Sequence, residues 1–388
     1  MSRRDLLAQI SASIGSYDLW GDLNRRITRG EVVPIISNSV INNRLFTIND
    51  DGQLILSRDV TEETEAYHFM VDEQLAGAWA NLIKYPLAES PFQLPRVAQY
   101  NQVKSRDNSE AKTNYLTFLK LYLLQLALDD EDAADVADTL VKPLDGLSFP
   151  EIAVQLADYS FAEIVFQLGY PRFAGQEQNP LYLLAQLPLP VYVTTSHHDF
   201  IERALVEAGK FPRLQVCSWS GETLPPEWFG DPPGPEADLQ AEPAEGQPIV
   251  YHLYGLEKYP TSLVISEDDY LDFLVKVSED RNSIPLGLRR AIGKSSLLLL
   301  GYRLRDWDFR ALFRGLIKTS KLQQANFAIQ LDPHVPQAVG DEGTVQSYLK
   351  EAQRYLQAYF EPANFKVEWY STNSFCARLV QKWRESQK

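Results

Sequence analysis

The sequence predicts an α/β fold, in which a mostly parallel sheet carries helices on both faces and a large helical insertion. Three observations support this prediction. Short apolar runs alternate with helical patterns in the second half of the chain, which is typical of strand–helix–strand units. These runs are apolar at nearly every position, as expected of strands that are buried on both faces. Between residues 61 and 187 the periodicity is helical, and no strand run interrupts it.

The N-terminal part of the chain begins with a predicted helix at residues 4–29, where apolar residues recur at helical spacing. The run GEVVPIIS at 30–37 follows and predicts a buried strand. Residues 42–58 contain the turn signals IND and DG, which indicate a loop or a hairpin. The helical insertion then begins near residue 60.

The C-terminal part supplies the other strands, with a helical pattern after most of them. The six predicted strand runs are PVYVTTS at 190–196, LQVCSWS at 214–220, IVYHLYG at 249–255, SLLLLGY at 296–302, FAIQLDP at 327–333 and KVEWYS at 366–371. Residues 221–247 are rich in proline, glycine and acidic side chains. This composition predicts a solvated surface loop, or a segment that becomes ordered against a partner.

Composition narrows the classes of partner and compartment. The net charge is −15 and the pI about 4.9, so a broad basic face for nucleic acid and binding to anionic membranes are not expected. Cys217 and Cys376 form no CxxC pair, which argues against a zinc site or a disulfide framework and suits a reducing cytoplasm. The N-terminus lacks the apolar run of a signal peptide, and SLLLLGY is too short to span a bilayer. We therefore expect a soluble cytoplasmic protein with no metal.

Candidate ligand-binding residues follow the strands, because ligands of parallel sheets bind at the carboxyl ends of strands. The strand ends read Ser37-Asn38-Ser39, Thr194-Thr195-Ser196-His197-His198, Tyr254-Gly255 and Gly301-Tyr302-Arg303. Histidine has a pKa suited to acid–base work at neutral pH, so the adjacent pair His197 and His198 is a candidate for chemistry. The alternative is that one histidine lies at the mouth of the cleft and the other faces solvent.

Several stretches, in order, resemble the sirtuin-like family, and most of all its prokaryotic members that hydrolyse NAD⁺ in anti-phage defence. They are RVAQY at 96–100, VYHLYGLEKYPTSLVISEDDYLDFL at 250–274, LLLLGYRLRDWDFRALFRGL at 297–316 and VEWYSTNSFCARLVQKW at 367–383. The resemblance implies one domain over residues 1–388. Its Rossmann-like core would comprise 30–59 and 188–388, and the helical insertion 60–187. It also implies an NAD or ADP-ribose-like nucleotide, and a homo-oligomer or a partner protein in a defence complex.

The chemical motifs of this family are altered here. The first strand should end in Gly-Ala-Gly-x-Ser, whose glycines let the backbone approach a pyrophosphate, but the chain has Ser37-Asn38-Ser39. The second motif, Thr-Thr-Asn-Tyr-Asp, aligns without a gap, so Ser196 stands for the asparagine and His198 for the aspartate. The third, Leu-His-Gly, reads Leu253-Tyr254-Gly255, and tyrosine is a poor base at neutral pH.

His252 precedes Tyr254 by two residues, so an extended strand would place both on one face about 7 Å apart. Tyr254 is expected either to stack on a nucleotide or to plug the cleft. Ser37, Asn38 and Ser39 are expected to bond a ligand or to form a capping turn. Gly301 is kept where the family has a glycine beside the nucleotide. The arginines from Arg303 to Arg310 are expected to pair with Asp306 and Asp308 rather than to bind phosphate.

Two functions remain open on these residues. The first is a sirtuin-like pseudoenzyme, which acts as a sensor, scaffold or assembly subunit and binds an NAD-like nucleotide without turnover. The second is an active NAD⁺ hydrolase. Its catalytic residues would be Ser196, His198, His252 and Tyr254. In either case the nucleotide-binding residues would be Ser37, Asn38, Ser39, Thr195, Gly255 and Gly301. Aromatic residues of the C-terminal helices, among them Tyr348, Tyr355 and Trp383, are expected in a partner surface or in the core.

Overall fold

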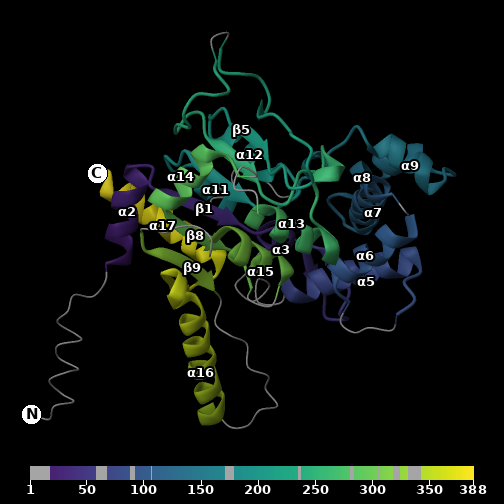
Figure 1. Ribbon diagram of the computed structural model, residues 1–388. Helices are drawn as coiled ribbons and strands as arrows, with labels where there is room; N and C mark the ends of the chain where they lie inside the picture. Colours follow the sequence, from purple (N-terminus) through teal and green to yellow (C-terminus); the bar gives the residue numbers. More distant parts are fainter. Residues whose placement is uncertain are drawn as a thin grey trace, which may run out of the picture.

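A central eight-stranded sheet organises the protein (Figure 1). The computed structural model describes residues 18–57, 68–87, 92–105, 107–170, 179–234, 237–279, 284–303, 306–317, 324–330 and 342–388. The strand order is β10-β9-β8-β1-β4-β7-β5-β6, and every neighbouring pair is parallel except β5 with β6. The strands are β1 (Val32–Ile36), β4 (Val191–Thr194), β5 (Arg213–Val216), β6 (Glu227–Trp228), β7 (Ile249–His252), β8 (Ser296–Leu300), β9 (Asn326–Gln330) and β10 (Phe365–Trp369). The predicted α/β class with a mostly parallel, Rossmann-like sheet is confirmed.

The inner strands are buried on both faces. Every residue of β1, β4, β8 and β9 is buried, which explains why their sequences are apolar without alternation. Each predicted run is longer than its strand, because the last residues of the run leave the sheet in a turn. Those turns hold Ser37, Ser196, Tyr254 and Gly301 at the carboxyl edge of the sheet.

Two hydrophobic layers cover the sheet. On one face, residues such as Tyr192 and Leu298 pack with helices α2 (Leu19–Thr28), α11 (Pro180–Ala185), α12 (Phe200–Glu207) and α17 (Thr372–Ser386). On the other, residues such as Val193 and Leu299 pack with α13 (Glu267–Glu279), α14 (Leu286–Lys294) and α15 (Trp307–Leu312). Helices on both faces of a parallel sheet give the predicted layering.

A block of helices lies beside the carboxyl edge (Figure 1, blue). It comprises α5 (His68–Ile83), α6 (Leu94–Ser105), α7 (Asn108–Leu128), α8 (Ala134–Val141), α9 (Phe149–Leu156) and α10 (Phe161–Gln167). Ser148 and Ser160 begin α9 and α10 with capping boxes, in which a glutamate three residues later bonds back to the serine N–H. No strand lies among the described residues from 68 to 185. The division of the chain into a core and an insertion stays a prediction.

The remaining elements are short, with one exception. Helix α3 (Ser39–Leu45) leads into the antiparallel hairpin of β2 (Phe46–Ile48) and β3 (Leu54–Leu56), within the range predicted as loop or hairpin. Short 3-10 turns are η1 (Lys142–Leu144), η2 (Pro260–Ser262) and η6 (Glu361–Ala363), and the π-helical turn η4 (Phe313–Ile317) continues α15. Helix α16 (Glu342–Phe360) packs against β10 at its C-terminal end, and the rest of the helix projects away from the sheet (Figure 1). Of its aromatic residues, Tyr348 and Tyr355 are exposed and Phe360 is in the core.

The acidic segment 221–247 lies at the surface, as predicted, with each of its described residues exposed or half-buried, and part of it is also anchored to the sheet. Its residues Glu227 and Trp228 form β6 and add an antiparallel edge to the sheet. The buried guanidinium of Arg213 donates to the carbonyls of Leu239 and Ala241 and lies 5.7 Å from the Trp228 ring. A buried charge needs such partners, so Arg213 fixes the segment against the sheet.

Other predictions are settled only in part. Residues 1–17, Arg305 and the end of the 327–333 run lie outside the described residues. Cys217 and Cys376 are buried, and neither forms a disulfide. None of the described helices is long and apolar enough to cross a membrane.

Candidate functional site

The turns after β1, β4, β7 and β8 meet at one edge of the sheet, as the parallel topology requires. The backbone N–H of Thr195 donates to the carbonyl of Ile36 (3.0 Å) and continues the β1–β4 pairing past the strand end. The hydroxyl of Thr195 lies 3.0 Å from the hydroxyl of Tyr302, which follows β8. The structure therefore brings the predicted strand-end residues together.

Ser196 links two of these turns. Its hydroxyl donates to Asn38 Oδ1 (3.0 Å) and accepts from the backbone N–H of His198 (3.2 Å). Ser196 is buried, and its own N–H donates to the hydroxyl of Thr194. The hydroxyl predicted to be catalytic in an active hydrolase thus joins the β1 turn to the β4 turn.

Ser37 forms a turn and also meets a carboxylate. Its hydroxyl accepts from the N–H of Ser39 (3.3 Å), which gives the predicted capping turn. The same hydroxyl donates to Asp308 Oδ2 (3.0 Å), on α15. Burial and then the neighbouring Asp306 raise the pKa of Asp308 to about 7. A carboxyl group of the chain therefore occupies the ligand side of the β1 turn.

Other residues of the chain pack closely against the two glycines of the site. Gly301 has φ +78°, and a Cβ there would lie 2.5 Å from Val40 Cγ2. Gly255 has φ +88°, and a Cβ there would lie 2.3 Å from the carbonyl oxygen of Ser262. Both positions need glycine for backbone conformation and for packing, whether or not a ligand is bound.

Tyr254 fills the edge of the sheet from within. Its hydroxyl donates to the backbone carbonyl of Asp308 (2.5 Å), and its ring meets Tyr270 and Phe273 edge to face at 5.4 and 5.0 Å. Burial raises the pKa of Tyr254 well above its usual value, so it is neutral. Of the two expectations for this residue, the arrangement matches the plug.

The prediction that His252 and Tyr254 share a face is wrong. Strand β7 ends at His252, so the alternation of a strand stops before Tyr254. His252 Nε2 lies 2.5 Å from Glu202 Oε1 on α12, and its Nδ1 lies 3.0 Å from the carbonyl oxygen of Ser196. Tyr254 belongs to the hydrophobic layer on the opposite face of the sheet.

His252 and Glu202 form a fully buried ion pair. Burial alone would lower the pKa of His252, but the charge and hydrogen bond of Glu202 outweigh it, and the pKa is raised. Both ring nitrogens of the resulting cation donate, one to Glu202 and one to the carbonyl of Ser196. The imidazole has no lone pair left to accept a proton from water.

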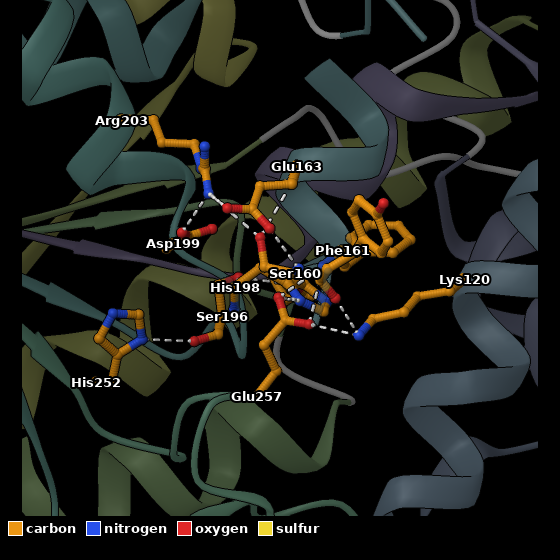
Figure 2. Close-up of polar contacts among 12 residues, drawn as sticks. Lys120, Ser160, Phe161, Glu163, Ser196, His198, Asp199, Arg203, His252 and Glu257 are labelled. Atoms are coloured by element: carbon orange, nitrogen blue, oxygen red, sulfur yellow. Dashed lines mark hydrogen bonds and ion pairs between the residues drawn. The ribbon is translucent and has the colours of Figure 1, made fainter. Parts of the chain in front are cut away.

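His198 joins the sheet to the helical block (Figure 2). Its Nδ1 lies 2.9 Å from Glu257 Oε1, and its ring packs 4.6 Å from the ring of Phe161. Glu257 also accepts from the backbone N–H of Phe161 at the start of α10 and pairs with Lys120 of α7 (3.7 Å). Burial would raise the pKa of Glu257, but His198 and Lys120 hold it below its usual value. The carboxylate thus binds a histidine of the core and two elements of the block.

The ring of His197 lies 6.4 Å from the ring of His198. Burial, and then the neighbouring His198, lower the pKa of His197 to about 3, although a bond to the carbonyl of Val264 opposes the shift. Its Nε2 is buried without a hydrogen-bond partner. At neutral pH the ring is therefore a neutral imidazole. His197 is partly exposed, whereas His198 is buried and so does not face solvent.

His197 should make the fold acid-sensitive. Its pKa is lower in the folded state than the unfolded value of about 6.5, so the unfolded chain binds more protons between pH 3 and 6.5. Stability then falls as the pH falls, by roughly 3 kcal/mol between pH 7 and 4 from this group. The free energy of unfolding of His197→Gln, measured with denaturant across this range, should depend less steeply on pH than that of the wild-type chain. An unchanged pH dependence would contradict the lowered pKa of His197. His252→Gln is the comparison, because the raised pKa of His252 contributes in the opposite direction.

Comparison with known proteins finds a similarity over the part of the chain that contains β4, β7 and β8. Residues 190–357 match the SIR2-like domain family. This part of the chain is similar to a SIR2-like domain. Over 161 residues the chain is 25% identical to the NAD(+) hydrolase ThsA of Cytobacillus dafuensis. The match covers 40% of this chain and 28% of that protein, so the chain spans well under two thirds of the relative's length.

The residues at the end of β1, which precedes the matched part of the chain, do not fit the pyrophosphate of NAD⁺. Val40 packs on Gly301, and the carboxyl of Asp308 contacts Ser37 where the backbone should approach a phosphate. Arg303 forms ion pairs with Asp306 and Asp72 (2.8 Å each). The pair with Asp306 was predicted from the sequence. Among the described residues of the chain, no three or more histidine, cysteine, aspartate or glutamate side chains lie together as a group that could hold a metal ion.

The sequence interpretation missed the acidic partners Glu202, Glu257 and Asp308. One signal for Glu202 was available: it lies between Ile201 and Ala204 on the buried side of α12, where an acid must find a buried partner. Glu257 and Asp308 follow a turn and a helix start, and nothing local marks them as buried. Their partners come from distant segments.

Proposed function

We propose that the chain is a SIR2-like pseudoenzyme, a sensor, scaffold or assembly subunit of a prokaryotic defence or signalling system. One observation carries the proposal. Ser196, His198, His252 and Tyr254 are each at most 3% exposed, and each bonds to another group of the chain. A general base must lie within hydrogen-bond reach of the proton that it removes, and the water or substrate must have access to it.

In such a pseudoenzyme these polar contacts hold the elements of the fold together. His198 and Glu257 tie the sheet to α7 and α10, and His252 with Glu202 ties β7 to α12. We further propose a homo-oligomer or a defence-complex partner protein, a cytoplasmic location, and no contact with nucleic acid or membrane. The exposed Tyr348 and Tyr355 of α16 favour a protein partner, since large exposed apolar side chains on one helix face often mark interaction surfaces.

A second candidate function is NAD⁺ hydrolysis, which the named activity of ThsA and the His198–Glu257 dyad favour. Water would attack the anomeric carbon of the ribose as the bond to nicotinamide breaks, and the products are nicotinamide, ADP-ribose and a proton. His198, oriented by Glu257, would take the proton from the water, and Ser196 would orient that water. This function requires the edge to open, since these groups are enclosed by the chain.

Incubation of the purified chain with NAD⁺ separates the two functions. We expect no release of nicotinamide above that of a Ser196→Ala/His198→Ala double variant, because no enclosed group reaches a substrate. Chromatography of nicotinamide and ADP-ribose is the measurement, repeated with cell extract from the native host to supply any activating partner. Release that depends on Ser196 and His198 would establish the hydrolase and end the pseudoenzyme proposal.

A further inference from the structure

The carboxyl end of β1 is closed by an acidic side chain of the domain itself. Asp308 Oδ2 accepts from the hydroxyl of Ser37 (3.0 Å), the first residue after β1. In the turn after the neighbouring strand β8, a Cβ at Gly301 would lie 2.5 Å from Val40 Cγ2 and 3.4 Å from Ser37 Cβ. In open parallel sheets this crevice is the place where nucleotide phosphates bind.

The charges around this crevice are unevenly compensated. Arg303 donates to Asp306 and to Asp72, so its positive charge is committed to these two carboxylates. Asp308 is held instead by neutral donors, the hydroxyl of Ser37 and the backbone N–H of Phe309 (2.6 Å to Oδ1). A phosphate at the β1 turn would therefore meet a carboxylate whose charge no described ion pair offsets.

We propose that Asp308 is a specificity-determining residue that selects against the pyrophosphate of NAD⁺ and related dinucleotides at the end of β1. The inference rests on the proposed function, because a chain that turns over NAD⁺ must admit that pyrophosphate. Two effects act together. The carboxyl group takes up the space beside Ser37. Its negative charge also repels a phosphate, and such repulsion is strong in a partly buried site.

Titration of Asp308 makes this selection depend on pH. The groups that face it are Asp306 in the preceding loop, Asp72 on α5, Tyr254 after β7, Tyr270 on α13 and Tyr302 after β8. The three tyrosines have raised pKa values and stay neutral, and Arg303 holds the two aspartates. The pKa of Asp308 is about 7, so its charge is lost as the pH falls through neutrality.

Calorimetric titration of the full chain with ADP-ribose tests the inference. At about pH 8 we expect Asp308→Asn to bind about tenfold more tightly than the wild-type chain, since asparagine keeps the shape and removes the charge. Asp306→Asn is the matched control. It removes the same charge two residues earlier in the chain, but Asp306 bonds to Arg303 and not to Ser37, so we expect a much smaller gain in affinity.

The wild-type chain provides a second measurement that needs no variant. Lowering the pH from about 8 to about 6 should tighten its binding of ADP-ribose severalfold. The phosphodiester groups of ADP-ribose do not titrate in this range, and the affinity of Asp308→Asn should stay constant. Should that variant fail to fold, the wild-type titration decides alone.

The outcomes distinguish this inference from the proposed function. Equal affinities of the wild-type chain and Asp308→Asn, or a wild-type affinity that is independent of pH, would overturn the role of Asp308 and leave the pseudoenzyme proposal standing. Nicotinamide release from NAD⁺ by Asp308→Asn with tightened ADP-ribose binding would support the role of Asp308. Nicotinamide release by the wild-type chain would end the pseudoenzyme proposal.

Discussion

Replacing Glu202 by glutamine is expected to lower the free energy of unfolding by about 3–5 kcal/mol, because removal of one partner leaves the other charge buried without compensation. Glu202 Oε1 lies 2.5 Å from His252 Nε2, and both side chains are fully buried. Glutamine keeps the size of the side chain, so the loss would come from charge. Equilibrium denaturation in urea is the measurement.

The control is Glu207→Gln, on the same helix but exposed, which should change stability by less than about 0.5 kcal/mol. The loss of unfolding free energy caused by Glu202→Gln should also become smaller as the pH rises. The pKa of His252 is raised in the folded state, so the stability from its charged form is complete below about pH 6.5 and is lost above the folded pKa. A deficit that is below about 1 kcal/mol, or that grows with pH, would contradict the ion pair.

The strands could be predicted because burial on both faces leaves a local trace. The run at 296–302 gave a strand at Ser296–Leu300, and its remaining residues Gly301 and Tyr302 formed the turn. Strand β6 left no such trace. Glu227 and Trp228 are held at the sheet edge by pairing with β5 and by the loop carbonyls that Arg213 binds, and neither contact depends on apolar periodicity.

The positions of the site residues could be predicted, but their partners could not. The parallel topology alone brings Ser37, Thr195 and Gly301 to one edge. The bonds that decide the availability of each group join residues far apart in sequence, such as Ser196 with Asn38 across 158 positions. The rule of alternation failed at His252 and Tyr254 because the strand ended between them, and strand ends are poorly defined by sequence.

Gly255→Ala should destabilise the domain by about 3 kcal/mol or more, because two costs add there. The residue has φ +88°, where a side chain is strained, and its Cβ would lie 2.3 Å from the carbonyl oxygen of Ser262. That carbonyl accepts from Trp219 Nε1 (2.6 Å), so it cannot retreat without breaking a buried hydrogen bond. Gly209→Ala is the matched control, since Gly209 has φ +79° with nothing within 4 Å of its added Cβ, and it should cost only about 1 kcal/mol. Equal losses of unfolding free energy in the two variants would mean that backbone strain alone requires the glycine. A larger loss at Gly255 would mean that the turn after β7 is packed by the chain itself, which explains a glycine there without a ligand.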